Sequence, residues 1–232
     1  MKRLSMSIIQ LFHQIRNDPM LLTSCFAPII VGLVIKFGIP YLEKGILYSF
    51  SKYYLIFDLF LSIMAPILMC FAFAMITLEE IDDNIARYFS ITPLGKSGYL
   101  LTRLGLPALL SMLMGFLVLV FCALSELSLL MKICLSILGA IQAVIVSLMI
   151  ITLSTNKLEG MAITKLAVLT LLGLPVPFFI TNNLQFAAAF LPSFWVAKTV
   201  QSTSFIFLIP ALVVAALWYG FLKKRLTNKL AR

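Results

Sequence analysis

Charged residues are scarce in this chain of 232 residues, and acidic ones are the scarcest, with nine Asp and Glu against 18 Lys and Arg. Only 12% of the residues are charged, whereas 62% are hydrophobic, well above the ~45–50% of ordinary soluble domains. A chain this short cannot bury that much apolar surface in a domain surrounded by water. The composition therefore predicts one all-α domain, residues 1–232, that crosses a lipid bilayer several times.

Side chains that bind metals or carry out catalysis are also few. The single histidine, His13, cannot form a metal site alone. The four cysteines lie in or beside apolar stretches, as buried free thiols do: Cys25, Cys70, Cys122 and Cys134. Gly95-Lys96-Ser97 matches the end of a nucleotide-binding P-loop, but Ser90 stands where that motif needs its first glycine. We therefore expect no enzymatic activity, metal or cofactor in this chain.

Six long apolar segments dominate the sequence. A helix needs about 20 mostly apolar residues to cross the ~30 Å core of a bilayer. The six predicted membrane-spanning helices are Leu21–Ile39, Tyr53–Leu78, Tyr99–Leu124, Leu129–Leu153, Ile163–Ile180 and Phe205–Leu222. The second is long enough to tilt or to extend beyond the headgroups.

Lysine and arginine are distributed unevenly between the two sides of these segments. Thirteen lie on the side of the N-terminus: Lys2, Arg3, Arg16, Arg87, Lys96, Arg103, Lys157, Lys165, Lys223, Lys224, Arg225, Lys229 and Arg232. Four lie on the other side: Lys44, Lys52, Lys132 and Lys198. Basic loops stay in the cytoplasm, so we predict a plasma-membrane protein with both termini cytoplasmic.

The net charge of +9 is therefore interpreted as a topology signal. A nucleic-acid-binding protein would instead gather its positive charges on one folded basic face. The basic tail, residues 223–232, is expected to anchor the last helix at a cytoplasmic surface that contains anionic lipid.

The N-terminal segment, residues 1–20, is polar and amphipathic, unlike the apolar core of a cleaved signal peptide. Its apolar residues recur at helical spacing between Leu4 and Arg16: Leu4, Ile8, Leu11, Phe12 and Ile15. This pattern predicts a helix that lies in the membrane interface. The first apolar segment is then expected to remain as an anchor.

The cytoplasmic segment 79–98 carries the densest acidic cluster of the chain: Glu79, Glu80, Asp82 and Asp83. Ile81, Ile85 and Phe89 lie four residues apart and form one apolar stripe. Acidic residues suit the first turn of a helix, and Pro93 would end it. We therefore predict a separate short amphipathic helix between the second and third spans.

Two polar side chains lie within predicted spans. Asp58 is an acid inside the second span, where ionisable residues are costly and are often functional. It also lies about five residues from the outer end, so two interpretations stay open: a role in transport, or contact with headgroup water. Gln142 in the fourth span is expected to form an interhelical hydrogen bond.

The outer segment before the last span, residues 181–204, is half apolar. Its aromatic residues are Phe186, Phe190, Phe194 and Trp195. A loop surrounded by water would be more polar, so we expect a re-entrant or interfacial helical hairpin. A belt of aromatic side chains at the membrane surface is the alternative.

These features together resemble the membrane subunits of type-two ATP-binding-cassette (ABC) exporters, including the drug-export permeases. The resemblance covers essentially the whole chain. Its most specific part runs from Glu79-Glu80 through Thr92-Pro93-Leu94 and Tyr99-Leu100 to Arg103, and the outer hairpin adds Pro192 and Trp195.

The resemblance implies that the chain forms a transport path together with a second permease subunit, identical or homologous. A separate ABC ATPase, which carries ATP and Mg, would dock on a coupling helix. The ATPase-coupling residues would be Glu79, Glu80, Asp82, Asp83, Ile85, Arg87, Phe89, Thr92, Pro93 and Leu94. Candidate residues of the substrate path are Asp58, Phe190, Phe194 and Trp195. Spans rich in Phe, Met and Leu favour a hydrophobic or amphipathic cargo such as a drug, lipid or peptide.

Two other functions fit a small, enzyme-free membrane protein. One is the substrate-capture subunit of a vitamin uptake system, which would lack the acidic helix between spans two and three. The other is a membrane scaffold or immunity protein without transport activity. Co-purification of an ATPase would favour the exporter over both.

Overall fold

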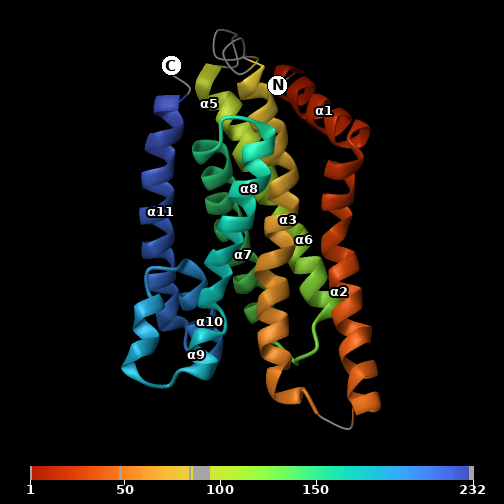
Figure 1. Cartoon of the computed structure of the whole chain (residues 1–232), viewed down its shortest axis with the longest axis vertical. Helices are drawn as coiled ribbons and strands as arrows, with labels where there is room; N and C mark the ends of the chain where they lie inside the picture. Colours follow the sequence, from red (N-terminus) through yellow and green to blue (C-terminus); the bar gives the residue numbers. More distant parts are fainter. Residues whose placement is uncertain (1, 47–48, 84, 86–94, 230–232) are drawn as a thin grey trace.

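The computed structural model describes residues 2–46, 49–83, 85 and 95–229, and within those ranges every regular element is a helix (Figure 1). The all-α prediction is thus confirmed for the described part of the chain. The longer helices are α1 (Lys2–Asn17), α2 (Pro19–Ile46), α3 (Tyr54–Asp82), α6 (Leu106–Cys122), α7 (Leu129–Leu153), α8 (Lys157–Val168) and α11 (Leu208–Lys229). Shorter helical pieces are η1 (Ser51–Tyr53), α5 (Gly95–Leu100), η2 (Leu101–Gly105), η3 (Leu169–Gly173), α9 (Val176–Phe179), η4 (Asn183–Ala188), α10 (Pro192–Gln201) and η5 (Phe205–Phe207).

Within the described part of the chain, six helical segments are long and apolar enough to cross a membrane, as the sequence predicts. They are Pro19–Gly45, Ser51–Asp82, Gly98–Cys122, Leu129–Leu153, Lys157–Phe179 and Phe205–Lys229. Several extend beyond the predicted limits, because polar residues at the ends continue the helix after the apolar stretch has ended.

The fifth span starts earlier than the sequence predicts, at Lys157 instead of Ile163. It begins at Lys157 because the Asn156 side chain accepts a hydrogen bond from the Glu159 backbone N–H at 2.9 Å and so caps α8. The Glu159 carboxylate in turn accepts from the Thr155 backbone N–H at 2.7 Å. Asn followed three residues later by Glu is a helix-start signal that hydropathy does not detect.

Helices α3 and α7 form the centre of the bundle, whereas α2 and α11 are the most exposed spans and stand at opposite edges in Figure 1. Helices α3 and α7 approach closely at Gly139, where an added Cβ atom would lie 2.1 Å from the Ser62 carbonyl oxygen. Small residues let transmembrane helices pack backbone against backbone. Gly139 therefore sets the distance between the two central helices.

Replacing Gly139 by leucine should destabilise the protein by ~1–3 kcal/mol or more, because α3 and α7 must separate to admit the side chain. The matched control is Gly220→Leu in α11, where an added Cβ atom meets nothing within 4 Å. Thermal unfolding in detergent measures both variants. Equal melting temperatures for the two would contradict the close packing of α3 on α7.

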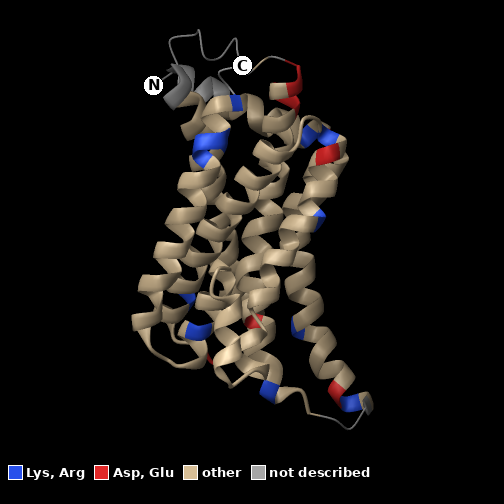
Figure 2. Ribbon diagram, turned by 60° about the vertical axis from the view of Figure 1, so that its left-hand side comes forward, with Lys and Arg blue, Asp and Glu red and all other residues tan. Residues whose placement is uncertain are grey.

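The start of α1 and the end of α11, the described residues nearest the two termini, lie at the same end of the bundle, as an even number of crossings requires (Figure 1). Most of the charged residues gather near the two ends, which leaves the middle of the bundle largely apolar (Figure 2). This distribution fits a bundle whose middle lies in the hydrocarbon core.

Helix α1 packs sideways on the end of the bundle that holds the termini. Leu11 and Ile15 are buried in the core, whereas Ile9 and Phe12 are about half exposed. The helix thus buries one apolar side against the bundle, and a second set of apolar side chains remains exposed at the surface.

The segment 181–204 contains η4 and α10 and lies at the end opposite the termini, beside α11 (Figure 1). Phe194 in α10 is fully buried and packs edge-on against Trp195, with ring centroids 5.2 Å apart. The Trp195 indole donates to the Ala189 carbonyl at 2.7 Å. The segment is therefore folded and packed against the bundle.

Candidate functional site

The acidic residues Glu79, Glu80 and Asp82 lie in the last turn of α3 and Asp83 caps it, so the prediction that they open a short helix is wrong. Residues 86–94 of that predicted helix lie outside the described part of the chain. Helix α3 continues without interruption to Asp82, because Leu78 and Ile81 extend its apolar face. Acidic groups at the C-terminus of a helix oppose its dipole. Two of them are compensated by basic partners from other helices.

The first pair joins Glu80 to Arg103, and both side chains are essentially unexposed. Arg103 Nε donates to Glu80 Oε2 at 2.8 Å, and its Nη2 donates to Oε1 at 2.5 Å. The Tyr99 hydroxyl adds a third bond to Oε2 at 3.1 Å. A buried carboxylate is thus bonded on both oxygens, as burial of a charge requires.

The position of Arg103 explains how this pair forms. Arg103 lies in the π-helical turn η2, which connects α5 to α6. Such wide turns are rare and often mark functional sites. The pair therefore ties the end of α3 to the start of the third span, on the two sides of segment 86–94.

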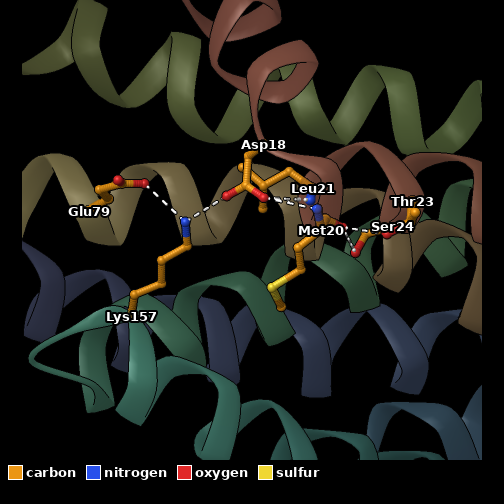
Figure 3. Close-up of polar contacts among 7 residues, drawn as sticks. All are labelled: Asp18, Met20, Leu21, Thr23, Ser24, Glu79 and Lys157. Atoms are coloured by element: carbon orange, nitrogen blue, oxygen red, sulfur yellow. Dashed lines mark hydrogen bonds and ion pairs between the residues drawn. The ribbon is translucent and has the colours of Figure 1, made fainter.

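The second basic partner is Lys157, the first residue of α8, which lies between two carboxylates (Figure 3). Its ammonium group lies 2.8 Å from Asp18 Oδ2 and 3.3 Å from Glu79 Oε2. The other oxygen of Asp18 accepts from the backbone N–H groups of Met20 and Leu21 and caps α2. Lys157 thus connects the starts of α2 and α8 to the end of α3.

The hydrogen bond from Lys157 lowers the pKa of the Asp18 carboxyl below its ordinary value. A folded-state pKa below the unfolded one means that this contribution to stability is present above the ordinary carboxyl pKa and is lost as the pH falls through the folded value. We expect Asp18→Ala to lower stability by ~0.5–2 kcal/mol at pH 7 through the lost cap.

Asp18→Asn is the matched variant, since asparagine keeps a capping oxygen but lacks the negative charge. At pH 7, Asp18→Asn should lower the melting temperature less than Asp18→Ala does. The difference in melting temperature between Asp18→Asn and the unmodified protein should be smaller at pH 3 than at pH 7. A difference that widens on acidification would contradict the ion pair.

The remaining predicted coupling residues divide into two groups. Asp82 and Asp83 are exposed at the end of α3, and Ile85 is partly buried. The other five lie outside the described residues: Arg87, Phe89, Thr92, Pro93 and Leu94. Among the predicted acids, Glu79, Asp82 and Asp83 are therefore accessible to a partner, whereas Glu80 is held by Arg103.

Asp58 has a structural partner that the sequence did not reveal. Its carboxylate is fully buried and accepts hydrogen bonds from the backbone N–H groups of Leu124 and Ser125, at 2.8 and 2.7 Å. The Ser125 hydroxyl donates to it as well. Asp58 therefore fixes the chain where it leaves α6, and the interpretation as a carboxylate in headgroup water is wrong.

The three aromatic candidates for the substrate path lie in different surroundings. Phe194 is fully buried, Trp195 is partly buried, and Phe190 is 63% exposed. The Phe190 carbonyl accepts a hydrogen bond from the Trp218 indole at 3.0 Å, which connects segment 181–204 to α11. Of the three side chains, Phe190 is therefore the most exposed, and Phe194 is inaccessible from the surface.

Comparison with known proteins decides the family. The chain matches the Rv2686c-like family, described as fluoroquinolones export permease protein Rv2686c-like, over residues 12–223. The chain belongs to this family of export permeases. It is 24% identical over 189 residues to the fluoroquinolones export permease proteins Rv2686c and MT2760 of two Mycobacterium tuberculosis strains, H37Rv and CDC 1551. The alignment covers 78% of this chain and 75% of either relative. No solved structure matches.

The sequence-based identification as a drug-export permease is thereby confirmed. In this permease, a further polar contact was predicted correctly: Gln142 donates to the Thr170 hydroxyl at 3.1 Å and joins the fourth and fifth spans. Among the residues that the structure describes, no group of three His, Cys, Asp or Glu side chains could hold a metal ion.

Asp18 and Lys229 make contacts that the sequence did not predict. Asp18 precedes Pro19, and a capping acid before a proline in the first helical position is a signal that could have identified it. Lys229 donates to the Ile151 carbonyl at 2.7 Å and to that of Ser154, so it covers the C-terminal end of α7. A contact between residues 78 apart has no local sequence signal.

Proposed function

We propose that this permease is the membrane subunit of an ABC exporter, powered by a separate ATPase subunit that carries ATP and Mg. A second permease subunit, identical or homologous, completes the path across the membrane. The cargo is a hydrophobic or amphipathic molecule, with fluoroquinolone-like drugs favoured by the names of the two relatives. Both termini lie in the cytoplasm.

The observation that carries this proposal, beside family membership, is the fixed position of the acidic end of α3. Glu79, Asp82 and Asp83 are exposed on a helix that forms the centre of the bundle. The Glu80–Arg103 pair and the Lys157 bridge hold this end against α6 and α8. A push from a docked ATPase on segment 79–98 would therefore move α3 and the third span together, rather than bend a loose loop.

Co-purification tests the proposal. The tagged permease, expressed with any ABC ATPase that a neighbouring gene encodes, should retain that ATPase through a mild detergent wash. The permease alone should show no ATP hydrolysis, because residues 90–97 lack a complete P-loop. Hydrolysis by the purified chain, at a rate unaffected by removal of contaminants, would refute a separate power source.

A further inference from the structure

A lateral groove runs along α11 on the side that faces α6. It consists of two adjoining cavities of about 500 and 560 Å³, which share Gly105, Ala108, Val144 and Tyr219 as lining residues. Helices α6 and α11 form its walls and α7 its floor, since both walls pack on α7. The groove opens sideways, toward the space that the bilayer occupies.

Small residues create this groove. The small residues among its lining come from every side: Ala215 and Ala216 on α11, Gly105 at the end of η2, Ala108 on α6 and Ala140 on α7. Each leaves a gap where a larger apolar side chain would fill the space between the helices. The part of the groove near the middle of the bundle is lined almost entirely by apolar atoms.

The length of the groove matches one leaflet. Its lining on α11 extends from Leu212 to Thr227, which lie about 22 Å apart along a helix. Half of the ~30 Å hydrocarbon core is ~15 Å, so the groove spans one leaflet and reaches the headgroup region. Its upper end lies near the chain termini, since α11 ends there (Figure 1).

Most of the polar lining lies toward that end. Tyr219, Lys223 and Thr227 line the cavity nearer the termini, and the Lys223 ammonium lies 5.7 Å from the centre of the Tyr219 ring. None of the described residues that line the two cavities is acidic, and none of the salt bridges in the described part of the chain includes Lys223. The groove is thus apolar along its length and positive at its mouth.

We propose that this groove binds an anionic phospholipid from the leaflet on the side of the termini, with one acyl chain between α6 and α11 and the phosphate at Lys223. A cationic mouth on an apolar groove complements the charge and shape of such a lipid. A second copy of the chain fits less well, because a two-fold axis along the membrane normal would bring two basic ends together. The proposal does not depend on the partner ATPase.

Native mass spectrometry of the full chain, with phosphatidylglycerol and phosphatidylcholine offered in equal amounts, tests the site. The unmodified protein should bind phosphatidylglycerol preferentially. Lys223→Gln should reduce that preference about fivefold, the effect expected of one basic residue at a membrane surface. The control Lys224→Gln, also exposed in α11 but outside the groove lining, should leave the preference unchanged.

Filling the groove tests the acyl-chain part separately. Ala216→Leu should reduce binding of both lipids, whereas Val213→Leu, on an exposed part of α11 outside the lining, should not. Equal binding of the two lipids by the unmodified protein, or the same loss in both lysine variants, would overturn the proposal. Cysteines at Ala108 and Ala216 that cross-link two copies in the membrane would also overturn it, in favour of a dimer interface.

Discussion

Replacing Arg103 by alanine is expected to destabilise the permease by ~3–5 kcal/mol, because it leaves the buried Glu80 carboxylate without its cation. A typical domain has only ~5–15 kcal/mol of stability in total, so little folded protein should remain at physiological temperature. The measurement is the melting temperature in detergent, together with the yield of monodisperse protein. A melting temperature equal to that of the unmodified permease would show that the pair contributes nothing.

A double variant separates the pair itself from the penalty of leaving one charge alone. Glu80→Met combined with Arg103→Met should recover most of the lost stability, since well-packed apolar residues often replace a buried ion pair at little cost. Arg103→Lys should retain much less of the stability that Arg103→Ala loses, because an ammonium group cannot form the two parallel hydrogen bonds that the guanidinium makes. The variant with both Glu80→Met and Arg103→Met also tests coupling between the ATPase and the bundle. If it folds but loses ATP-driven transport, the ion pair is needed to transmit movement from the ATPase.

Reversing the charge of Asp82 and Asp83 together, each to lysine, should weaken ATPase binding about tenfold or more while leaving the permease folded. Both side chains are exposed, so the bundle loses no packing. If the acids meet basic groups on the ATPase, the introduced lysines would repel those groups. Such like-charge contacts cost several kcal/mol at an interface, and ~1.4 kcal/mol corresponds to a tenfold change in affinity. Binding of the purified ATPase to permease in nanodiscs, measured at low and moderate salt, gives the result.

The matched control is Glu126→Lys, an exposed acid in the loop between α6 and α7 at the opposite end of the bundle. It changes the net charge in the same direction but lies far from the proposed docking segment. Because one reversal changes the net charge by half as much as two, a loss of binding free energy about half as large for Glu126→Lys would mean that only the overall charge matters. An unchanged affinity after reversal of Asp82 and Asp83 would remove these acids from the ATPase interface.

Hydropathy was sufficient to predict the six spans and the all-α class, because each span carries enough apolar residues to be recognised without its neighbours. The start of α8 required a different signal, the Asn156 cap, which is local but polar. The continuation of α3 through its acidic turn was predicted wrongly, because four acids in five residues resemble a helix start when their partners are unknown.

The pairing of the acids could not be predicted, because it depends on which helices become neighbours. Glu79 and Glu80 are adjacent, yet one bonds to Lys157, 78 residues away, and the other to Arg103, 23 residues away. Asp58 and Ser125 are 67 residues apart. Such contacts follow from tertiary packing, whereas the sequence reveals only that an ionisable group in a span needs some partner.

The most direct test of the central claim is ATP-driven movement of a fluorescent fluoroquinolone across proteoliposomes that contain the permease and its ATPase. We predict that the drug accumulates on the side opposite the ATPase only when both subunits and Mg-ATP are present. Reversing the charges of Asp82 and Asp83 should abolish this accumulation. Movement of the drug at the same rate without the ATPase or without ATP would contradict a permease driven by a separate subunit.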